Sequence, residues 1–159
     1  MSRNQRQPDD APDPDLDACI EAGTDCVSFG LRKASRSVSQ IYDAALEPAG
    51  LKGTQFSLLA ALHLAGPVSI TRLARTLVMD RTTVTRNLKP LERRGLIAIL
   101  PGADQRTRQA ALTPLGRELL ARALPLWRAA QARTLERIGV ERWQRLSLDL
   151  GAVVEGMRP

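Results

Sequence analysis

Residues 69–95 read SITRLARTLVMDRTTVTRNLKPLERRG, and this stretch predicts two helices joined by a tight turn. Ser69 has a side chain suited to cap a helix, and apolar residues follow it at helical spacing. The helical spacing of apolar residues is then interrupted before Asp80. Asp80 can cap a second helix, Arg81–Arg94, which ends at Gly95. The order helix, turn, helix therefore decides how the middle of the chain folds.

The second helix has one apolar side and one polar, basic side. Val84, Leu88 and Leu91 lie on the apolar side, which must face a core. The opposite side carries Thr82, Arg86, Lys89 and Arg93. From Ser69 to Arg117 the chain holds ten lysines and arginines against three acidic residues, a net charge of +7, whereas the whole chain has +6. Hydroxyls at the start of a helix and cations along its free face suit entry into the major groove of DNA.

Individual contacts can be assigned on this face. We expect Thr82, Thr83 and Arg86 to contact bases, because an arginine can bind a guanine edge at two points. Asn87 lies to the side of the face and either joins these contacts or pairs with the neighbouring turn. The side chains expected to contact phosphates are those of Ser69, Thr71, Lys89 and Arg93.

A wing is predicted after the second helix. The strands Leu96–Leu100 and Gln109–Leu112 flank a turn rich in residues that favour turns. Arg106 near the tip is the expected minor-groove contact, and Asp104 is expected to steer its guanidinium through a charge-assisted hydrogen bond. Arg108, two residues further on, points the same way and either contacts phosphate or stays in water.

Helices flank this winged segment, so we predict a mainly α-helical protein. The predicted parts are a disordered acidic tail (1–14), an N-terminal dimerisation helix (15–48), a winged helix-turn-helix DNA-binding lobe with a two-stranded wing (49–113), and a long helix with a C-terminal dimerisation helix (114–159). The expected flanking helices are Asp15–Leu46, Gln55–Leu64, Pro114–Ile138 and Glu141–Met157. The terminal helices are too apolar for one small lobe to cover. We expect a second copy of the chain to bury them, and an intrachain helical hairpin is the alternative.

Five stretches carry a family resemblance: GLKGTQFSLL (50–59), MDRTTVTRNL (79–88), LERRGL (91–96), DQRTR (104–108) and LTPLG (112–116). With the helix order, they make about residues 16–157 similar to the MarR family of bacterial winged-helix regulators. The resemblance implies a dimer with two winged helix-turn-helix lobes and a helical dimerisation region. It also implies repression of nearby genes, relieved by a small molecule or by thiol oxidation.

Pro90 departs from the usual pattern of a recognition helix. A proline inside a helix removes a backbone donor and costs about 3 kcal/mol. We expect a slight kink after Arg86, which would shift Arg93 relative to the groove.

The composition argues against other classes. Only 3% of the residues are aromatic, His63 is the one histidine, and the chain has no Gly-rich phosphate loop, Gly-x-Ser-x-Gly elbow or zinc-binding Cys/His spacing. We therefore expect no enzymatic activity, no cofactor and no metal. The polar N-terminus has no apolar run like that of a signal peptide, and no stretch approaches the ~20 apolar residues of a membrane span. These features predict a cytoplasmic protein without a membrane partner. A nonspecific architectural DNA binder is less favoured, because the recognition helix begins with hydroxyls that can contact bases.

An effector pocket is predicted between the lobe and the dimerisation region. Aromatic rings would hold a ring by stacking, and an arginine would hold a carboxylate, so a small aromatic acid is the expected effector. The predicted lining is Ser28, Phe29, Arg32, Arg36, Phe56, Ala60, His63, Trp127 and Gln131. Core packing explains Trp127 equally well, and His63 is also consistent with an interior histidine.

A rival form of control rests on the only two cysteines, Cys19 and Cys26. Without an export signal both are expected to be reduced thiols. Their oxidation would control the protein if the first helices of two subunits meet at a two-fold axis.

Overall fold

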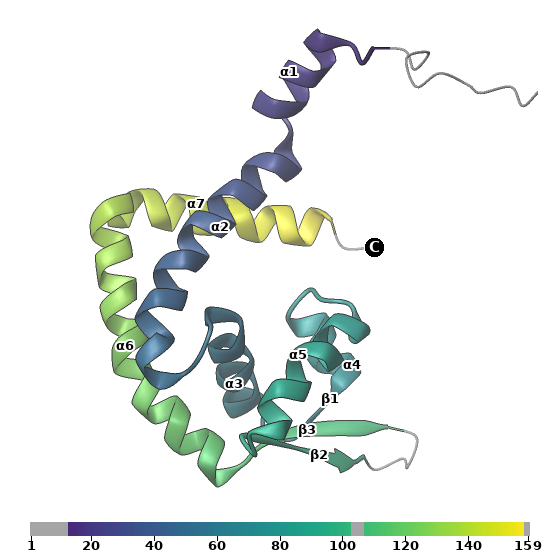
Figure 1. The fold of residues 1–159 in the computed structure, drawn as a ribbon, viewed down its shortest axis with the longest axis vertical. Coiled ribbons are helices and arrows are strands. Elements are labelled where there is room, and N and C mark those ends of the chain that lie inside the picture. Colours follow the sequence, from purple (N-terminus) through teal and green to yellow (C-terminus); the bar gives the residue numbers. More distant parts are fainter. Residues whose placement is uncertain (1–12, 103–106, 158–159) are drawn as a thin grey trace, which may run out of the picture. The chain divides into compact units, whose positions relative to one another are not determined.

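The structure is a computed structural model that describes residues 13–102 and 107–157. It contains two compact units, Met1–Val38 and Ser39–Pro159, and each is described here by itself. Figure 1 shows the elements in chain order.

The first unit contains α1 (Leu16–Thr24) and the N-terminal part of α2 (Val27–Leu46). Asp15 caps α1, and in the last turn the Thr24 hydroxyl donates to the Ile20 carbonyl at 3.1 Å. The helix then ends at Asp25. The prediction of one continuous helix through this region is wrong, because Gly23, Thr24 and Asp25 are weak helix formers in succession.

The second unit contains the rest of α2 and all later elements. They are η2 (Glu47–Ala49), α3 (Gly53–Ala65), β1 (Val68–Ser69), α4 (Ile70–Thr76), α5 (Arg81–Arg93), β2 (Ile97–Pro101), β3 (Arg108–Leu112), α6 (Pro114–Ile138) and α7 (Val140–Gly156). The fold is mainly helical with a small antiparallel sheet, which confirms the predicted class. The long helix has the predicted bounds, and Thr113 caps it by accepting from the backbone N–H of Gly116.

The sheet has three strands in the order β1-β3-β2, all antiparallel. Ala110 lies at its centre, opposite Val68 on one side and Ile99 on the other. The two predicted wing strands are thus confirmed as β2 and β3, and β1 is an additional strand that the sequence did not predict. The third strand has only two residues, too few to show an alternating pattern in the sequence.

The core lies between α3, α5, the sheet and the first half of α6. Leu59, Val84 and Leu91 have no exposed surface, and Ala123 of α6 is equally buried. The predicted core face of the recognition helix is thus confirmed. Leu46, at the end of α2, is also fully buried, so the last turn of α2 is fixed to this core.

The start of α6 approaches the strand region closely. The backbone N–H of Thr113 donates to the Leu96 carbonyl at 3.1 Å, and the Thr113 hydroxyl donates to the Gly95 carbonyl at 2.7 Å. A Cβ added to Gly116 would lie 2.0 Å from the Leu96 carbonyl oxygen. Only glycine fits there, so this residue sets how closely α6 lies against the segment that ends the recognition helix.

The C-terminal helix, α7, is less buried than the helices that form the core. No residue of α7 is buried, and its exposed apolar side chains include Leu146, Leu148 and Val153. Across residues 13–102 and 107–157, the helices are all too short or too polar to traverse a lipid bilayer.

Candidate nucleic-acid interface

The helix-turn-helix is positioned by two side-chain caps. The Ser69 hydroxyl accepts from the backbone N–H of Arg72 at 3.2 Å and begins α4. Asp80 accepts from the backbone N–H of Thr83 at 2.8 Å and begins α5. Both caps confirm what the sequence predicted, because each satisfies backbone donors that a helix start leaves unpaired.

The charge of the Asp80 cap is favoured by its surroundings. Hydrogen bonds from the side chain and the backbone of Thr83 hold the pKa of the Asp80 carboxyl below its usual range. The cap is therefore ionised at neutral pH, and its negative charge lies at the positive end of the helix dipole.

The turn between the helices is tight and contains one unusual backbone conformation. Val78 has a φ of +51°, in the left-handed region that β-branched residues rarely adopt. The backbone N–H of Met79 donates to the Ala74 carbonyl at 2.9 Å, which closes the turn. The Val78 side chain is 62% exposed, so no buried contact offsets this conformation.

The outer face of α5 forms a continuous polar, basic surface. One shallow hollow is lined by Arg81, Thr82, Thr85, Arg86 and Lys89. A second hollow, lined by Arg86, Lys89, Pro90, Glu92 and Arg93, adjoins it. We call these two hollows together the recognition surface. It combines hydroxyls with cations, a set of groups that can contact base edges and phosphates.

The recognition surface includes most of the predicted side chains on this helix. Thr82, Arg86, Lys89 and Arg93 are exposed. Thr83 is half-buried, and its side chain bonds the Asp80 cap. Asn87 is half-buried at the side, and the assignment of its contact stays a prediction.

Sequence reasoning missed Arg81 and Thr85. Both line the recognition surface, and the Thr85 hydroxyl donates to the Arg81 carbonyl at 2.8 Å. The pattern that could have revealed them is the spacing of four between Arg81, Thr85 and Lys89, which puts the three on one helical row.

The predicted contacts outside α5 are distributed over two elements. Thr71 is exposed on α4, whereas Ser69 is half-buried and takes part in both the cap and β1. Arg108 is exposed at the start of β3. Arg106 and Asp104, predicted at the wing tip, lie outside the described residues.

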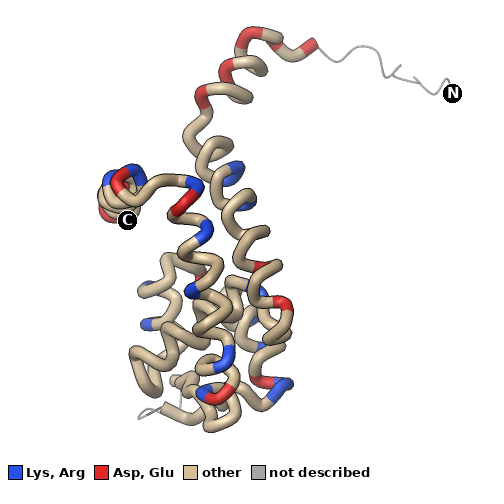
Figure 2. Tube along the Cα trace, turned by 90° about the vertical axis from the view of Figure 1, so that its left-hand side faces the viewer, with Lys and Arg blue, Asp and Glu red and all other residues tan. Residues whose placement is uncertain are grey.

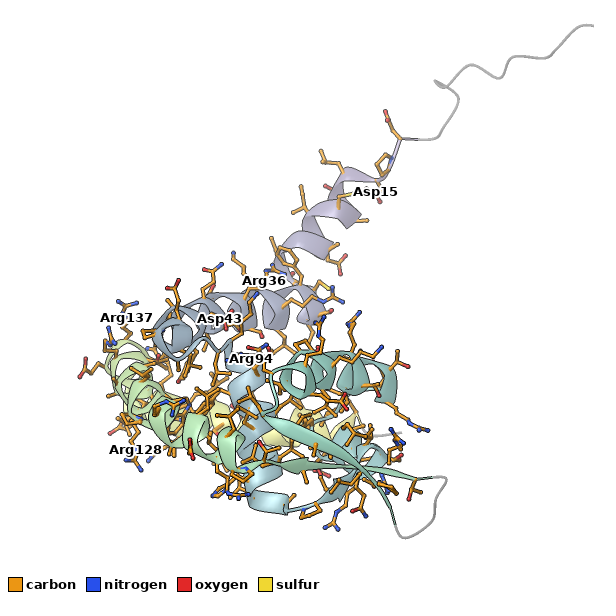
Figure 3. All side chains as sticks on the ribbon, turned by 60° about the horizontal axis from the view of Figure 1, so that its bottom comes forward. Asp15, Arg36, Asp43, Arg94, Arg128 and Arg137 are labelled. Atoms are coloured by element: carbon orange, nitrogen blue, oxygen red, sulfur yellow. The ribbon has the colours of Figure 1, made fainter. Side chains whose placement is uncertain are left out.

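The end of the recognition helix is attached to the turn before α3. Arg94 follows α5 and donates from Nη1 to the Gly50 carbonyl at 2.8 Å. It lines a hollow together with Asp43 of α2, and Figure 3 shows the two side chains near each other. Pro90 lies inside α5, which the structure assigns as one helix from Arg81 to Arg93. The kink predicted after Arg86 stays a prediction.

The two units differ in charge. Residues 13–26 contain five acidic residues and no lysine or arginine, and Figure 2 shows acidic positions along α1. The second unit carries the basic recognition surface. The acidic residues of 13–26 therefore lie in a different unit from the cations of the recognition surface.

The residues predicted for an effector pocket fall into both units. Ser28, Phe29, Arg32 and Arg36 are exposed on the part of α2 that belongs to the first unit. In the second unit Phe56 and Trp127 stack on each other, with ring centroids 5.9 Å apart and planes inclined by 14°.

The polar residues predicted for the effector pocket in the second unit are either hydrogen-bonded or exposed. The Tyr42 hydroxyl donates to the side-chain oxygen of Gln131. His63 is exposed in the last turn of α3, and Ala60 packs against the core. Tyr42 was missed by sequence reasoning, although it is the only tyrosine of the chain.

Comparison with known proteins gives consistent matches. The model of the MarR family matches residues 49–107. A transcriptional regulator of M. tuberculosis, MosR, solved in complex with DNA, is 40% identical, with 84% of this chain and 99% of that chain covered and a TM-score of 0.74. CouR from Rhodococcus jostii RHA1, solved with bound p-coumaroyl-CoA, is 25% identical, with 86% and 96% covered and a TM-score of 0.71.

The chain is also similar to a curated protein. The HTH-type transcriptional regulator YwoH of Bacillus subtilis (strain 168), itself uncharacterized, is 31% identical over 83 residues. That match spans 52% of this chain and 61% of the relative.

Proposed function

The chain belongs to the MarR family of transcriptional regulators and is a DNA-binding regulator rather than an enzyme, and from this premise we propose that it is a dimeric, sequence-specific repressor. In this proposal it acts on DNA in the cytoplasm, and a small aromatic acid releases it from its operator.

The proposal rests mainly on the recognition surface of α5. Arg86 lines both of its hollows, Thr82 lines the one at the capped helix start, and both side chains are exposed. The similarity to MosR, which was solved in complex with DNA, supports this use of the surface. Arg86 would bind a guanine edge, while Lys89 and Arg93 would neutralise phosphates.

Binding to the chain's own upstream DNA tests this function. Fluorescence anisotropy should show a complex that survives excess nonspecific competitor DNA, which separates a sequence-specific regulator from an architectural DNA binder. Arg86→Ala should weaken binding at least about fivefold, because a bidentate base contact contributes about 1–3 kcal/mol. Arg128→Ala is the matched control, since Arg128 is an exposed arginine of α6 outside the recognition surface. Unchanged affinity in Arg86→Ala would contradict the assignment.

Dimerisation is proposed from the terminal helices. The protein presents one recognition helix per chain, and reading a pseudo-palindrome requires two helices about one turn, ~10 bp, apart. Apolar side chains on α7 remain exposed, including Leu146 at 40% and Leu148 at 76%. On α2, Val27 is 73% exposed. Sedimentation at micromolar protein should give a dimer, and a monomer would contradict the proposal.

The effector is proposed to be an aromatic acid. CouR, bound to p-coumaroyl-CoA in its structure, supports the choice of an aromatic ligand. Phe56 and Trp127 are the aromatic residues of the predicted site in the second unit, and Arg32 is its predicted cation. A calorimetric screen of benzoates, phenylacetates and cinnamates against wild type and Arg32→Ala tests this. Binding that leaves operator affinity unchanged would remove the proposed control.

Thiol oxidation is the second candidate for control. Cys19 and Cys26 are both free and exposed, so an oxidant can reach them. Release from the operator by diamide, lost in a Cys19→Ser/Cys26→Ser variant, would favour oxidation over an aromatic ligand.

A further inference from the structure

The three threonines of α5 use their hydroxyls in different ways. The Thr83 side chain bonds the Asp80 cap. The Thr85 hydroxyl donates to the Arg81 carbonyl at 2.8 Å, inside the same helix. Thr82 is exposed on the recognition surface, where its hydroxyl can meet a group of the DNA. Thr85 is thus a residue of the recognition surface whose hydroxyl hydrogen is already used by the protein.

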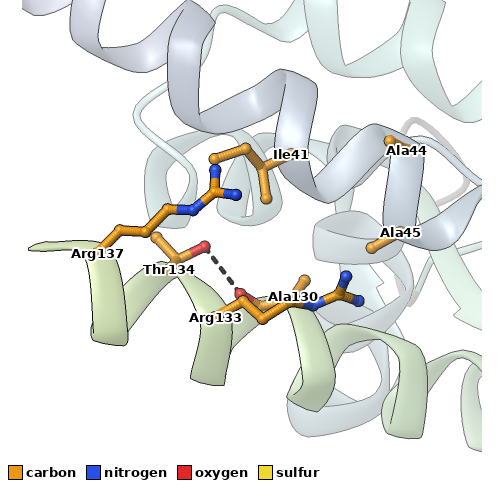
Figure 4. A pocket seen from close by; sticks show the side chains of 7 residues that line it. All are labelled: Ile41, Ala44, Ala45, Ala130, Arg133, Thr134 and Arg137. Atoms are coloured by element: carbon orange, nitrogen blue, oxygen red, sulfur yellow. Dashed lines mark hydrogen bonds between the residues drawn. The ribbon is translucent and has the colours of Figure 1, made fainter.

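The group that Thr85 leaves free is its methyl. A threonine that donates to the carbonyl four residues earlier holds its hydroxyl against the helix backbone. The same bond is present in α6, where the Thr134 hydroxyl donates to the Ala130 carbonyl at 2.8 Å. Figure 4 shows this hydroxyl turned to the carbonyl and the Thr134 methyl turned away from it. Since both groups leave the same Cβ in different directions, the bond at Thr85 likewise turns its methyl away from the Arg81 carbonyl.

Thr85 lies between two cations of the recognition surface. Arg81, Thr85 and Lys89 are spaced by four and share one row of α5. Arg81 and Lys89 are exposed, whereas the shorter Thr85 is half-buried, and all three line the same hollow. With the two cations on phosphates, the side chain between them faces the base edges in the groove. An apolar methyl at this place can read a base only through an apolar group.

We propose that Thr85 determines part of the sequence specificity by selecting a thymine, through contact of its methyl with the C5-methyl of that base. Thymine is distinguished in the major groove by this methyl group, whereas cytosine presents its amino group as a donor. The inference rests on the proposed function, because it requires α5 to lie in the major groove. It adds a thymine to the guanine that Arg86 would bind in the same half-site.

Deoxyuridine tests the contact, because it pairs as thymine does and lacks only the C5-methyl group. In the shortest upstream duplex that the protein binds specifically, each thymine is replaced in turn by deoxyuridine, and fluorescence anisotropy measures the affinity. Wild type should bind about fourfold more weakly when the contacted thymine is replaced, which is the effect of one buried methyl group.

Two variants assign this loss to the Thr85 methyl. Thr85→Ser keeps the hydroxyl and removes the methyl, so it should bind the thymine and the deoxyuridine duplexes equally at that position. Thr85→Val keeps a methyl and removes the hydroxyl, so it should still distinguish them. Thr24→Ser is the matched control, since the Thr24 hydroxyl makes the same kind of bond, to the Ile20 carbonyl in α1. It should give the wild-type scan, and circular dichroism checks that every variant is folded.

Three outcomes would overturn the inference while leaving the proposed function intact. One is a wild-type scan without a loss at any thymine. Another is a Thr85→Ser scan identical to that of wild type. The third is discrimination that is lost in Thr85→Val and kept in Thr85→Ser, which would show that the hydroxyl reads the base instead of the methyl. A wild-type protein that binds no upstream duplex specifically would contradict the proposed function, and this inference with it.

Discussion

Gly116→Ala should destabilise the second unit strongly, although alanine is the better helix former. The new Cβ would lie 2.0 Å from the Leu96 carbonyl oxygen, 3.0 Å from the Leu96 carbonyl carbon and 2.9 Å from Cδ1 of Leu112. Two of these atoms are backbone, so rotation of a side chain cannot relieve the clash. The start of α6 must move away, which also stretches the bond of 3.1 Å from the Thr113 N–H to Leu96.

The magnitude follows from three opposing terms. Overpacking against rigid neighbours costs about 3 kcal/mol at its upper end. A weakened hydrogen bond adds about 1 kcal/mol, and the better helix propensity of alanine returns about 1 kcal/mol. The net loss is about 3 kcal/mol, which for a chain of this size lowers Tm by about 6–12 °C.

Thermal and urea unfolding followed by circular dichroism measure this effect at equal protomer concentration. Gly151→Ala in α7 is the matched control, because nothing lies within 4 Å of its added Cβ. That variant should be as stable as wild type or up to about 1 kcal/mol more stable. A Gly116→Ala protein with wild-type Tm would show that the segment before β2 yields easily, and would refute the argument.

Three further predictions concern the helix-turn-helix. Arg94→Lys should lower both stability and operator affinity, because lysine does not reproduce the guanidinium hydrogen bond of 2.8 Å to the Gly50 carbonyl. Urea unfolding measures the stability and fluorescence anisotropy measures the affinity, and wild-type values in both would contradict the prediction. Asp80 has a lowered pKa from its Thr83 hydrogen bonds, so its stabilising contribution is present above the ordinary pKa of about 4 and is lost as pH falls through the lower folded value. The stability difference between wild type and Asp80→Asn should therefore shrink between pH 5 and pH 3 in urea unfolding, and a constant difference would argue against this. Val78→Gly should raise stability by about 0.5–1 kcal/mol, since φ is +51° and the side chain is mostly exposed; a lower Tm would contradict it.

Local sequence patterns predicted the helix starts well. Ser69, Asp80 and Thr113 each form the predicted cap, because a cap depends only on a side chain and the backbone three residues later. The bounds of α6 were also correct, although Pro125 lies inside that helix. Burial of the helix against the core outweighed the weak local preference there.

Features that depend on distant residues were missed. β1 exists because Val68 and Ser69 pair with β3, some forty residues later in the chain, and a two-residue strand has no pattern of its own. The break after Thr24 was missed because apolar residues continue at helical spacing through it. Tyr42 was missed because its contact with Gln131 joins two helices that the sequence could not place side by side.

In the second unit, two contacts with the backbone connect α2 and α6 to the ends of the recognition helix. Arg94, directly after α5, holds the Gly50 carbonyl in the turn that follows α2 and η2. Gly116 lets α6 lie against Leu96, which directly follows the turn that ends α5. A molecule between α2 and α6 that changes their separation would therefore act on α5 from both of these anchors. It would alter operator affinity only by binding the two separations differently, and a tenfold effect needs about 1.4 kcal/mol of such a difference.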